Sequence, residues 1–194
     1  MIDGDRLPTL RADRVLLRWL DAGDVDDLYR VFGDPAVMRY WSSPPLADRA
    51  AAGALLDDIR ALFDSRTLFQ WGVALAPGSP VIGTCTLCAF HEESGRAELG
   101  FALGRAHQRQ GYMTEALSTL LDFAFGPLGL RRLEADIDPR NGPSLRLVER
   151  LGFRREGLLR ERWLTAGEVQ DSVFCGLLRR EWLAGRRGDA PDRG

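Results

Sequence analysis

Cysteine is scarce in this chain, with three residues among 194. A small and odd number argues against a disulfide framework and for a reducing compartment, so we expect a cytoplasmic protein. No apolar run is long enough for a membrane-spanning helix, and the first residues, M-I-D-G-D, lack the basic start and apolar segment of a secretory signal. Lysine and arginine total 26 against 28 acidic residues, without a long basic run, so neither a nucleic acid nor a membrane surface is expected as a partner.

Metal-ligand patterns are equally sparse. Cys85 and Cys88 form a C-x-x-C pair with His91 close behind, but the pair lies inside an apolar run from Val81 to Phe90. Residues three apart in a strand face opposite sides, whereas zinc requires both thiolates on one side and a second pair of ligands elsewhere. We therefore predict structural cysteines and no metal site.

The chain does contain enough apolar material for a core. Apolar residues make up 45% of it and charged residues 28%, which is ordinary for a globular protein of one domain. We expect that domain to cover residues 1–184. Residues 185–194 are mostly Gly, Arg, Asp and Pro, and this composition predicts a disordered tail.

Periodicity and turn residues predict the order β-α-α-β-β-β-α-β-α-β-β. The expected strands are 15–20, 69–76, 81–90, 97–103, 132–138, 157–164 and 169–178, and the expected helices are 25–32, 47–62, 113–125 and 143–151. The early strands should pair as antiparallel hairpins. The step from strand 97–103 through helix 113–125 to strand 132–138 should be a right-handed parallel crossover. The fold class is therefore a mixed α/β sandwich of one sheet with helices.

The loop around Gly111 joins strand 97–103 to the most strongly patterned helix. A strand, a short polar loop with glycine and then a helix present bare backbone N–H groups and a positive dipole end to an anion. Arg109 adds a positive charge, and Gly111 lets the backbone approach a bulky group. The loop is a candidate phosphate site. The alternative is an ordinary β-α turn in which Gly111 only relieves the backbone.

The strand before this loop has an unusual face. Glu98 is followed on that face by Gly100, Ala102 and Gly104, which are all small. Glycine inside a strand often marks the close approach of a ligand or of another backbone. Either a ligand or a closely packed helix would explain the pattern.

A second loop precedes the helix 143–151. Asn141 fits a helix N-cap, and Pro143 fits the first turn. Ser144 shares the helix face of Leu147 and Val148, so its hydroxyl should lie along the buried stripe, at a helix N-terminus and at the end of a parallel strand. Either local capping or contact with a ligand would account for it.

These blocks together resemble the GNAT family of N-acetyltransferases. The run Q-R-Q-G-Y-M at 108–113 resembles the Q/R-x-x-G-x-G/A acetyl-CoA signature, with Met113 departing at the last position. The run N-G-P-S at 141–144, followed by a helix and by G-F at 152–153, is similar to the second GNAT block. The segments 9–18, 157–163 and 171–173 resemble the branch of ribosomal-protein N-terminal (alanine/serine) acetyltransferases. The resemblance spans about residues 10–183.

The resemblance implies a GNAT-like mixed, mostly antiparallel sheet with a central parallel β-α-β step, a splayed strand pair and helices on both faces. It also implies acetyl-CoA as cosubstrate and no metal. The implied CoA-binding residues are Phe101, Ala102, Leu103, Gln108, Arg109, Gln110, Gly111, Tyr112, Met113, Thr114, Asn141 and Ser144. Backbone amides from 108 to 114 would hold the pyrophosphate, the edge of strand 101–103 would pair with the pantetheine arm, and Asn141 would contact the pantetheine side.

The implied reaction is direct attack of a neutral amine on the thioester carbonyl. Glu98 resembles the strand carboxylate that acts as base in some GNAT enzymes. Glu161 is a second candidate base, although its match is two residues out of step. Ser144 matches the position proposed to protonate the leaving thiolate.

The acceptor is open at this point. A protein N-terminal α-amine is the first hypothesis, and a small amine such as a polyamine, an amino acid or an aminoglycoside is the second; an acidic pocket would favour the polyamine or the aminoglycoside. A non-catalytic acyl-CoA-binding module is a third hypothesis, of another class. Tyr40, Trp41 and Trp71 suggest an aromatic-lined acceptor site, although large aromatics also build cores. A homodimer is left open as the oligomeric state.

Overall fold

The computed structural model describes residue 2 and residues 4–188. One eight-stranded sheet runs through it in the order β1-β2-β3-β4-β5-β6-β8-β7. Its strands are β1 (Leu10–Arg11), β2 (Leu16–Arg18), β3 (Leu68–Ala74), β4 (Val81–His91), β5 (Arg96–Leu103), β6 (Arg132–Ile137), β7 (Arg154–Thr165) and β8 (Glu168–Leu178). Only β5 and β6 pair in parallel, and every other neighbouring pair is antiparallel. This confirms the predicted fold class.

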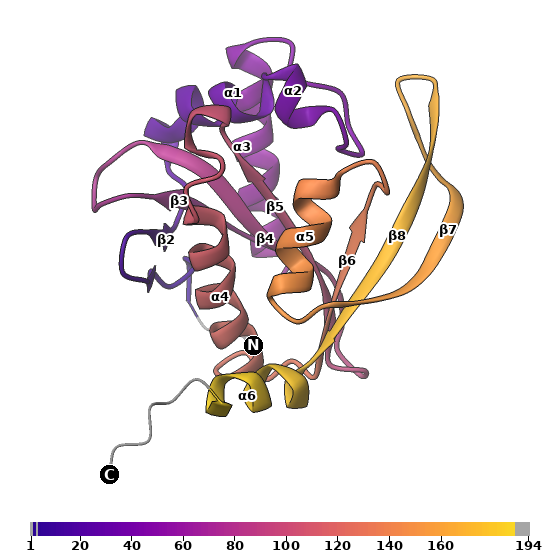
Figure 1. Ribbon diagram of the computed structural model, residues 1–194. Helices are drawn as coiled ribbons and strands as arrows, with labels where there is room; N and C mark the ends of the chain where they lie inside the picture. Colours follow the sequence, from indigo (N-terminus) through magenta and orange to yellow (C-terminus); the bar gives the residue numbers. More distant parts are fainter. Residues whose placement is uncertain (1, 3, 189–194) are drawn as a thin grey trace.

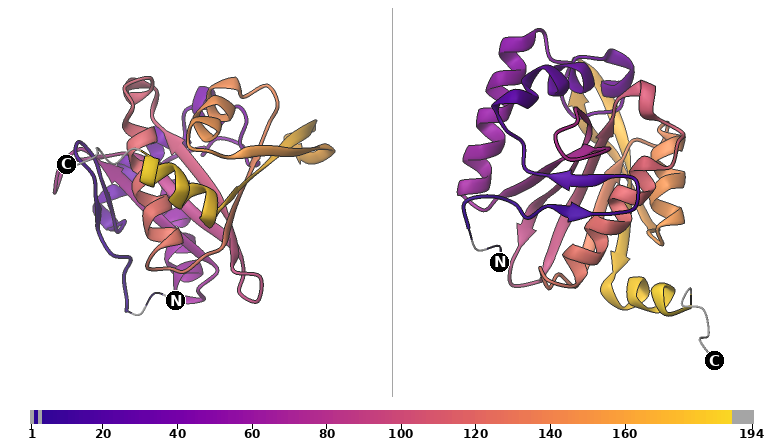
Figure 2. Two further views of the ribbon diagram at one scale, coloured as in Figure 1. Left: turned by 60° about the horizontal axis from the view of Figure 1, so that its bottom comes forward. Right: turned by 90° about the vertical axis from the view of Figure 1, so that its left-hand side faces the viewer.

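Helices cover both faces of the sheet (Figures 1 and 2). The single turn η1 (Ala22–Asp24) and helices α1 (Val25–Phe32), α2 (Pro35–Met38) and α3 (Arg49–Asp64) lie between β2 and β3. After β5 come the short turn η2 (Arg105–His107) and α4 (Tyr112–Phe125), and α5 (Gly142–Arg150) follows β6. None of the described helices combines the length and the apolar character that a bilayer crossing requires.

Two apolar clusters hold these layers together. The larger one joins α4 and α5 to one face of the sheet through residues such as Trp71, Leu99 and Leu133. The smaller one joins α1 and α3 to the other face, where Ala102 of β5 is buried. The six residues of the predicted stripe on α4 are all buried: Met113, Ala116, Leu117, Leu120, Leu121 and Ala124. The 3.6-residue period therefore placed this helix correctly.

The C-terminal helix α6 (Arg179–Gly188) was not expected from the sequence. It covers part of the segment 185–194 that we predicted to be disordered, so that prediction is wrong for residues 185–188; residues 189–194 lie outside the described part of the chain. Tertiary contacts explain the difference. Asp122 of α4 accepts hydrogen bonds from the Trp182 indole and the Arg186 guanidinium, and Glu181 accepts one from the backbone N–H of Leu178. Packing overrides the weak helix propensity of the glycines.

Candidate functional site

The loop between β5 and α4 has an unusual backbone. Gly111 is the N-cap of α4 and has a left-handed conformation, with φ of 84°. Arg109 also has a positive φ, of 62°. No side chain caps the first turn of α4. Two left-handed residues and an uncapped helix end leave the N–H groups of this segment turned away from the usual acceptors.

Six successive backbone N–H groups, from Arg109 to Thr114, donate no hydrogen bond to any residue in the described part of the chain. Glu115 is the first residue whose N–H finds a helical acceptor, the carbonyl of Gly111, at 3.1 Å. A backbone N–H normally has a partner, and an ordinary β-α turn would leave only the helix's own first N–H groups free. Together with the helix dipole, these donors could bind an anion with several oxygen atoms.

The side chains of the loop turn back and fix its shape. The amide of Gln108 donates to the carbonyl of Leu103, and the amide of Gln110 donates to the carbonyl of Ala106, both at 2.9 Å. Met113 points into the core, where its sulfur lies 3.6 Å from the sulfur of Cys85. The methionine side chain therefore lies away from the free N–H groups of the loop, so it is compatible with the candidate anion site although the GNAT signature has Gly or Ala there.

A second brace comes from the N-terminal segment. Glu115 of α4 accepts hydrogen bonds from the backbone N–H groups of Arg14 and Val15 and from the Arg14 side chain. The Arg14 guanidinium also donates to the carbonyl of Gln110 and lies 5.2 Å from the centre of the Tyr112 ring. Burial would raise the pKa of Glu115, but these hydrogen bonds outweigh it and lower the pKa. Arg14 therefore adds a fixed positive charge beside the loop.

Strands β5 and β6 separate directly below this loop. They pair only over three positions, from Arg96 opposite Arg132 to Glu98 opposite Glu134. Beyond Glu98, β5 remains paired with β4 alone, up to Leu103. The backbone of 99–103 therefore has one edge without a neighbouring strand, which is the splayed pair expected from the resemblance. An extended ligand could add to that edge as a strand does.

Glu98 lies where the two strands diverge. It is half-buried and shares its sheet face with Gly100, over which an added Cβ would meet no atom closer than 3.6 Å. The small-residue face is therefore open near Gly100 and not filled by a helix, although Ala102 further along is covered by the α1 and α3 cluster. The pKa of Glu98 is raised, mainly by burial and then by repulsion from Asp136 and Glu134. The attraction of Arg162 opposes this shift without cancelling it. A carboxylate with a raised pKa at an open position is a stronger proton acceptor than an ordinary carboxylate.

Asp136 of β6 organises the neighbouring part of the sheet. Its side chain is 4% exposed and accepts hydrogen bonds from the hydroxyl of Ser172, the indole of Trp163 at 3.1 Å and the guanidinium of Arg162 at 3.3 Å. Asp136 and Glu134 were not singled out from the sequence. The alternation of polar and apolar residues in β6 could have identified them, because it places both acids on the face opposite Leu133 and Ala135.

The same contacts hold an irregular part of β7. Three residues, Arg160 to Arg162, face the single residue Asp171 of β8. Glu161 sits in the middle of this bulge with a positive φ of 53°, and its N–H donates to the Asp171 carboxylate at 2.8 Å. Its own side chain is exposed. Sequence patterns do not predict such a bulge. The bulge determines where the Glu161 side chain, the second candidate base, points.

The loop after β6 ends at the N-terminus of α5. Asn141 caps the helix by accepting a hydrogen bond from the N–H of Ser144 at 3.3 Å. Ser144 was expected along the buried stripe of α5; it is half-buried, because it lies in the first turn at the surface end of that stripe. In the described residues its hydroxyl makes no hydrogen bond, so it is available to a ligand.

Asp138 stabilises this second loop. It accepts hydrogen bonds from the backbone and the guanidinium of Arg140, which also pairs with Glu168. Burial would raise the pKa of Asp138, but the Arg140 hydrogen bonds outweigh it and lower the pKa. The loop is thus held in one conformation by a charged pair at its base.

The three aromatic residues expected near an acceptor have different environments. Tyr40 is half-buried between two guanidinium groups, Arg39 at 5.3 Å and Arg140 at 5.7 Å, which places it beside the Asn141 loop. Trp41 packs edge-on against Phe32 at 5.8 Å. Trp71 is fully buried, and its indole donates to the carbonyl of Pro8. Its assignment to an acceptor site is therefore wrong, because its ring belongs to the core.

The cysteines of the C-x-x-C pair lie on opposite faces of β4, as predicted. Cys85 is fully buried in the larger cluster, whereas Cys88 is half-buried opposite Glu98. Burial raises the pKa of both thiols, that of Cys88 to about 11. Thiols of this kind are inert structural groups.

Comparison with known proteins gives the family. The model described as an acetyltransferase (GNAT) domain matches residues 14–154. An uncharacterized N-acetyltransferase, p20 of Bacillus licheniformis, is 35% identical over 91% of this chain and 99% of its own length. The ribosomal protein uS5-alanine N-acetyltransferase of Escherichia coli is 33% identical over 91% of this chain and 94% of its length. The spermidine N(1)-acetyltransferase of the same species is 24% identical over 89% and 90%.

Solved structures agree. A GCN5-related N-acetyltransferase from Brucella melitensis superposes with a TM-score of 0.82 at 28% identity, over 93% of this chain and 82% of that one. Spermidine N-acetyltransferase from Vibrio cholerae, solved with CoA and spermine, superposes with a TM-score of 0.77 at 23% identity, over 88% and 98%. The run of free N–H groups, the splayed strands and the match over most of the chain have one explanation: this protein belongs to the GNAT family and is an N-acetyltransferase.

Proposed function

We propose that the enzyme transfers an acetyl group from acetyl-CoA to the N-terminal α-amine of a protein. The observation that carries the donor assignment is the run of six free N–H groups from Arg109 to Thr114. A pyrophosphate has the charge and the number of oxygens to use them. The open edge of β5 at 101–103 would pair with the amides of the pantetheine arm, in the manner of an added strand.

Asn141 and Ser144 complete the donor side in this proposal. The Asn141 side-chain oxygen already caps α5, which leaves its amide nitrogen to donate to the pantetheine. The Ser144 hydroxyl would protonate the leaving thiolate, since it lies at a helix N-terminus, where negative charge is stabilised.

Glu98 is the proposed general base. Only the neutral amine has the lone pair that attacks the thioester carbonyl, and a protein α-amine has a pKa of about 7.7–8.0. The proton it loses can pass to a carboxylate with a raised pKa, directly or through one water molecule. Glu161 is the alternative base, but its side chain is exposed on the β7 bulge, whereas Glu98 is half-buried where β5 and β6 diverge.

The charges around the site favour an α-amine over a polyamine. Each acidic neighbour of Glu98 already has an arginine partner: Glu134 pairs with Arg96 and Arg132, and Asp136 with Arg162. The acid at the start of the second loop, Asp138, likewise pairs with Arg140. A polycation would need unneutralised carboxylates. The similarity to the ribosomal-protein acetyltransferase, at 33% identity, supports the same acceptor class.

A thiol-release assay tests this proposal. The panel contains acetyl-CoA with peptides that begin with alanine or serine, the same peptides with a blocked N-terminus and one internal lysine, spermidine, and an aminoglycoside. We expect turnover with the free N-terminal peptides only. Turnover restricted to spermidine or the aminoglycoside would overturn the acceptor class. Tight acetyl-CoA binding without turnover on any amine would make the chain a binding module.

Replacement of Asp136 by asparagine should change the pH dependence of the reaction. Asp136 repels the charged form of Glu98, so removing its charge should lower the pKa of Glu98. The base then stays ionised at lower pH, and the acidic limb of the kcat/KM profile should move to lower pH. Asp171→Asn is the matched control, because Asp171 contacts the same bulge but is not among the charges that shift Glu98. An unmoved limb in a folded Asp136→Asn protein would contradict Glu98 as the base.

A further inference from the structure

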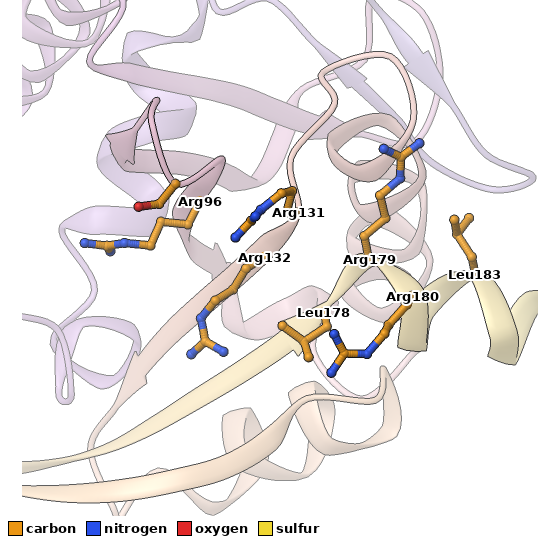
Figure 3. Close-up of a pocket in the computed structure, with 8 residues that line it drawn as sticks. Arg96, Arg131, Arg132, Leu178, Arg179, Arg180 and Leu183 are labelled. Carbon is orange, nitrogen blue, oxygen red and sulfur yellow. The ribbon is translucent and has the colours of Figure 1, made fainter.

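A pocket of about 480 Å³ lies at the end of the sheet opposite the Gly111 loop. Five arginines line it, from the starts of β5, β6 and α6: Arg96, Arg131, Arg132, Arg179 and Arg180 (Figure 3). Arg96 is the first residue of β5. The last residue of β5 is Leu103, and the Gly111 loop follows it. Seven residues of strand separate the two ends by roughly 23 Å. The pocket is therefore a separate site.

The positive charge of this pocket is only partly neutralised. Arg96 pairs with Glu134, and Arg132 pairs with Glu134 and Glu156. Within the described ranges, no carboxylate lies within 4.0 Å of Arg131, Arg179 or Arg180. The chain as a whole has a formal net charge of −2. Three unpaired arginines at one place in an acidic protein repel one another, and a bound anion would relieve that repulsion.

The walls of the pocket are joined by the backbone. The N–H of Arg131 donates to the carbonyl of Gly95 at 2.7 Å, and the carbonyl of Arg131 accepts from the N–H of Arg179 at 2.9 Å. The backbone of Arg131 thus links the start of β6 to the β4–β5 turn on one side and to the start of α6 on the other. The pocket is preorganised, so a ligand need not order these segments.

We propose that this pocket binds a small ligand with an oligophosphate chain. Guanidinium groups bind phosphate oxygens in pairs, which is why several arginines suit a chain of phosphates better than a single negative charge. In Figure 3, Arg132 at the start of β6 and Arg180 of α6 lie on either side of Leu178, and Arg131 precedes β6. The side chains of Leu178 and Leu183 add an apolar wall. Inorganic tripolyphosphate and a nucleoside triphosphate share the required chemistry.

Isothermal titration of the full chain with tripolyphosphate tests the proposal, with and without saturating acetyl-CoA. With saturating acetyl-CoA, which occupies the Gly111 loop, we expect one bound tripolyphosphate per chain; without acetyl-CoA, the Gly111 loop can add a second. The double variant Arg131→Gln/Arg180→Gln should bind about 100-fold more weakly, about tenfold for each lost charge-assisted contact. Arg150→Gln is the matched control, since Arg150 is exposed on α5 and lies outside the pocket. A parallel titration with ATP identifies the source: tighter binding than tripolyphosphate assigns a nucleotide, and equal binding assigns the phosphate chain alone.

Three results would overturn the proposal: no binding to the wild-type protein, equal affinity in the double variant, or loss of binding when acetyl-CoA is present. The last result would place the phosphates at the Gly111 loop. Because both substituted arginines are exposed, the variant should keep its melting temperature and its acetyl-CoA affinity, and these two measurements confirm that it is folded. The test does not depend on which amine the enzyme acetylates.

Discussion

Replacement of Glu98 by glutamine should lower kcat/KM for a peptide with a free N-terminus by about 100-fold, the lower end of a typical general-base contribution. Glutamine keeps the shape of the side chain but cannot accept a proton. The loss should be largest near neutral pH and should shrink at high pH, because there the α-amine is already deprotonated. The measurement is kcat/KM from pH 6 to pH 10, with the affinity for acetyl-CoA as a check that the donor side is unchanged.

Glu161→Gln is the matched control for this experiment. Glu161 is the second candidate base, and its side chain is exposed at the β7 bulge. We expect a change of less than about threefold, since an exposed carboxylate has no fixed position from which to take the proton. If Glu161→Gln loses activity while Glu98→Gln keeps it, the base is Glu161 and the assignment to Glu98 is wrong.

Glu98→Gln, which lowers the activity, should raise the stability of the folded protein at neutral and higher pH. The folded state raises the pKa of Glu98 above its usual value of 4.5. A carboxyl group of this kind favours the folded state below pH 4.5, and that contribution is lost as the pH rises through the folded pKa. Glutamine does not titrate, so Glu98→Gln should melt higher than the wild-type protein at pH 8. The difference between their melting temperatures should become smaller toward pH 4.

The Gly111 loop illustrates how far the sequence could go. The glycine, the polar residues before it and the apolar stripe after it are local signals, and local signals predicted both the helix and its exposed N-terminus. They could not decide between an anion site and an ordinary turn. The free N–H groups of residues 109–114 favour the anion site, and they depend on the left-handed conformations of Arg109 and Gly111.

The parts that the sequence missed depend on contacts between distant segments. Trp71 looked available for an acceptor, but the carbonyl of Pro8, 63 residues away, satisfies its indole and keeps the ring in the core. The bulge at Glu161 is held by Asp136 and Asp171, from two other strands. Periodicity describes one element at a time and contains no information on such partners.

Replacement of Gly111 by alanine should weaken acetyl-CoA binding about tenfold or more. A side chain at φ of 84° is strained by roughly 1–2 kcal/mol, and its Cβ would lie 3.0 Å from a nitrogen of the Arg14 guanidinium. A change of the backbone angles at position 111 would relieve the strain and the close contact. The same change would turn the neighbouring N–H groups away from a common anion. The dissociation constant of acetyl-CoA measures this change, and kcat at saturating acetyl-CoA should change much less.

Gly129→Ala is the control that distinguishes the effect of backbone strain from an effect on the acetyl-CoA site. Gly129 follows α4 with φ of 74°, and an added Cβ there would meet no atom within 4 Å. Both variants should therefore lose similar stability in thermal unfolding, since both place alanine in the left-handed region. Only Gly111→Ala should lose affinity for acetyl-CoA. Equal affinities in the two variants would mean that the free N–H groups at 109–114 do not hold the pyrophosphate, and the donor would have to bind elsewhere on β5.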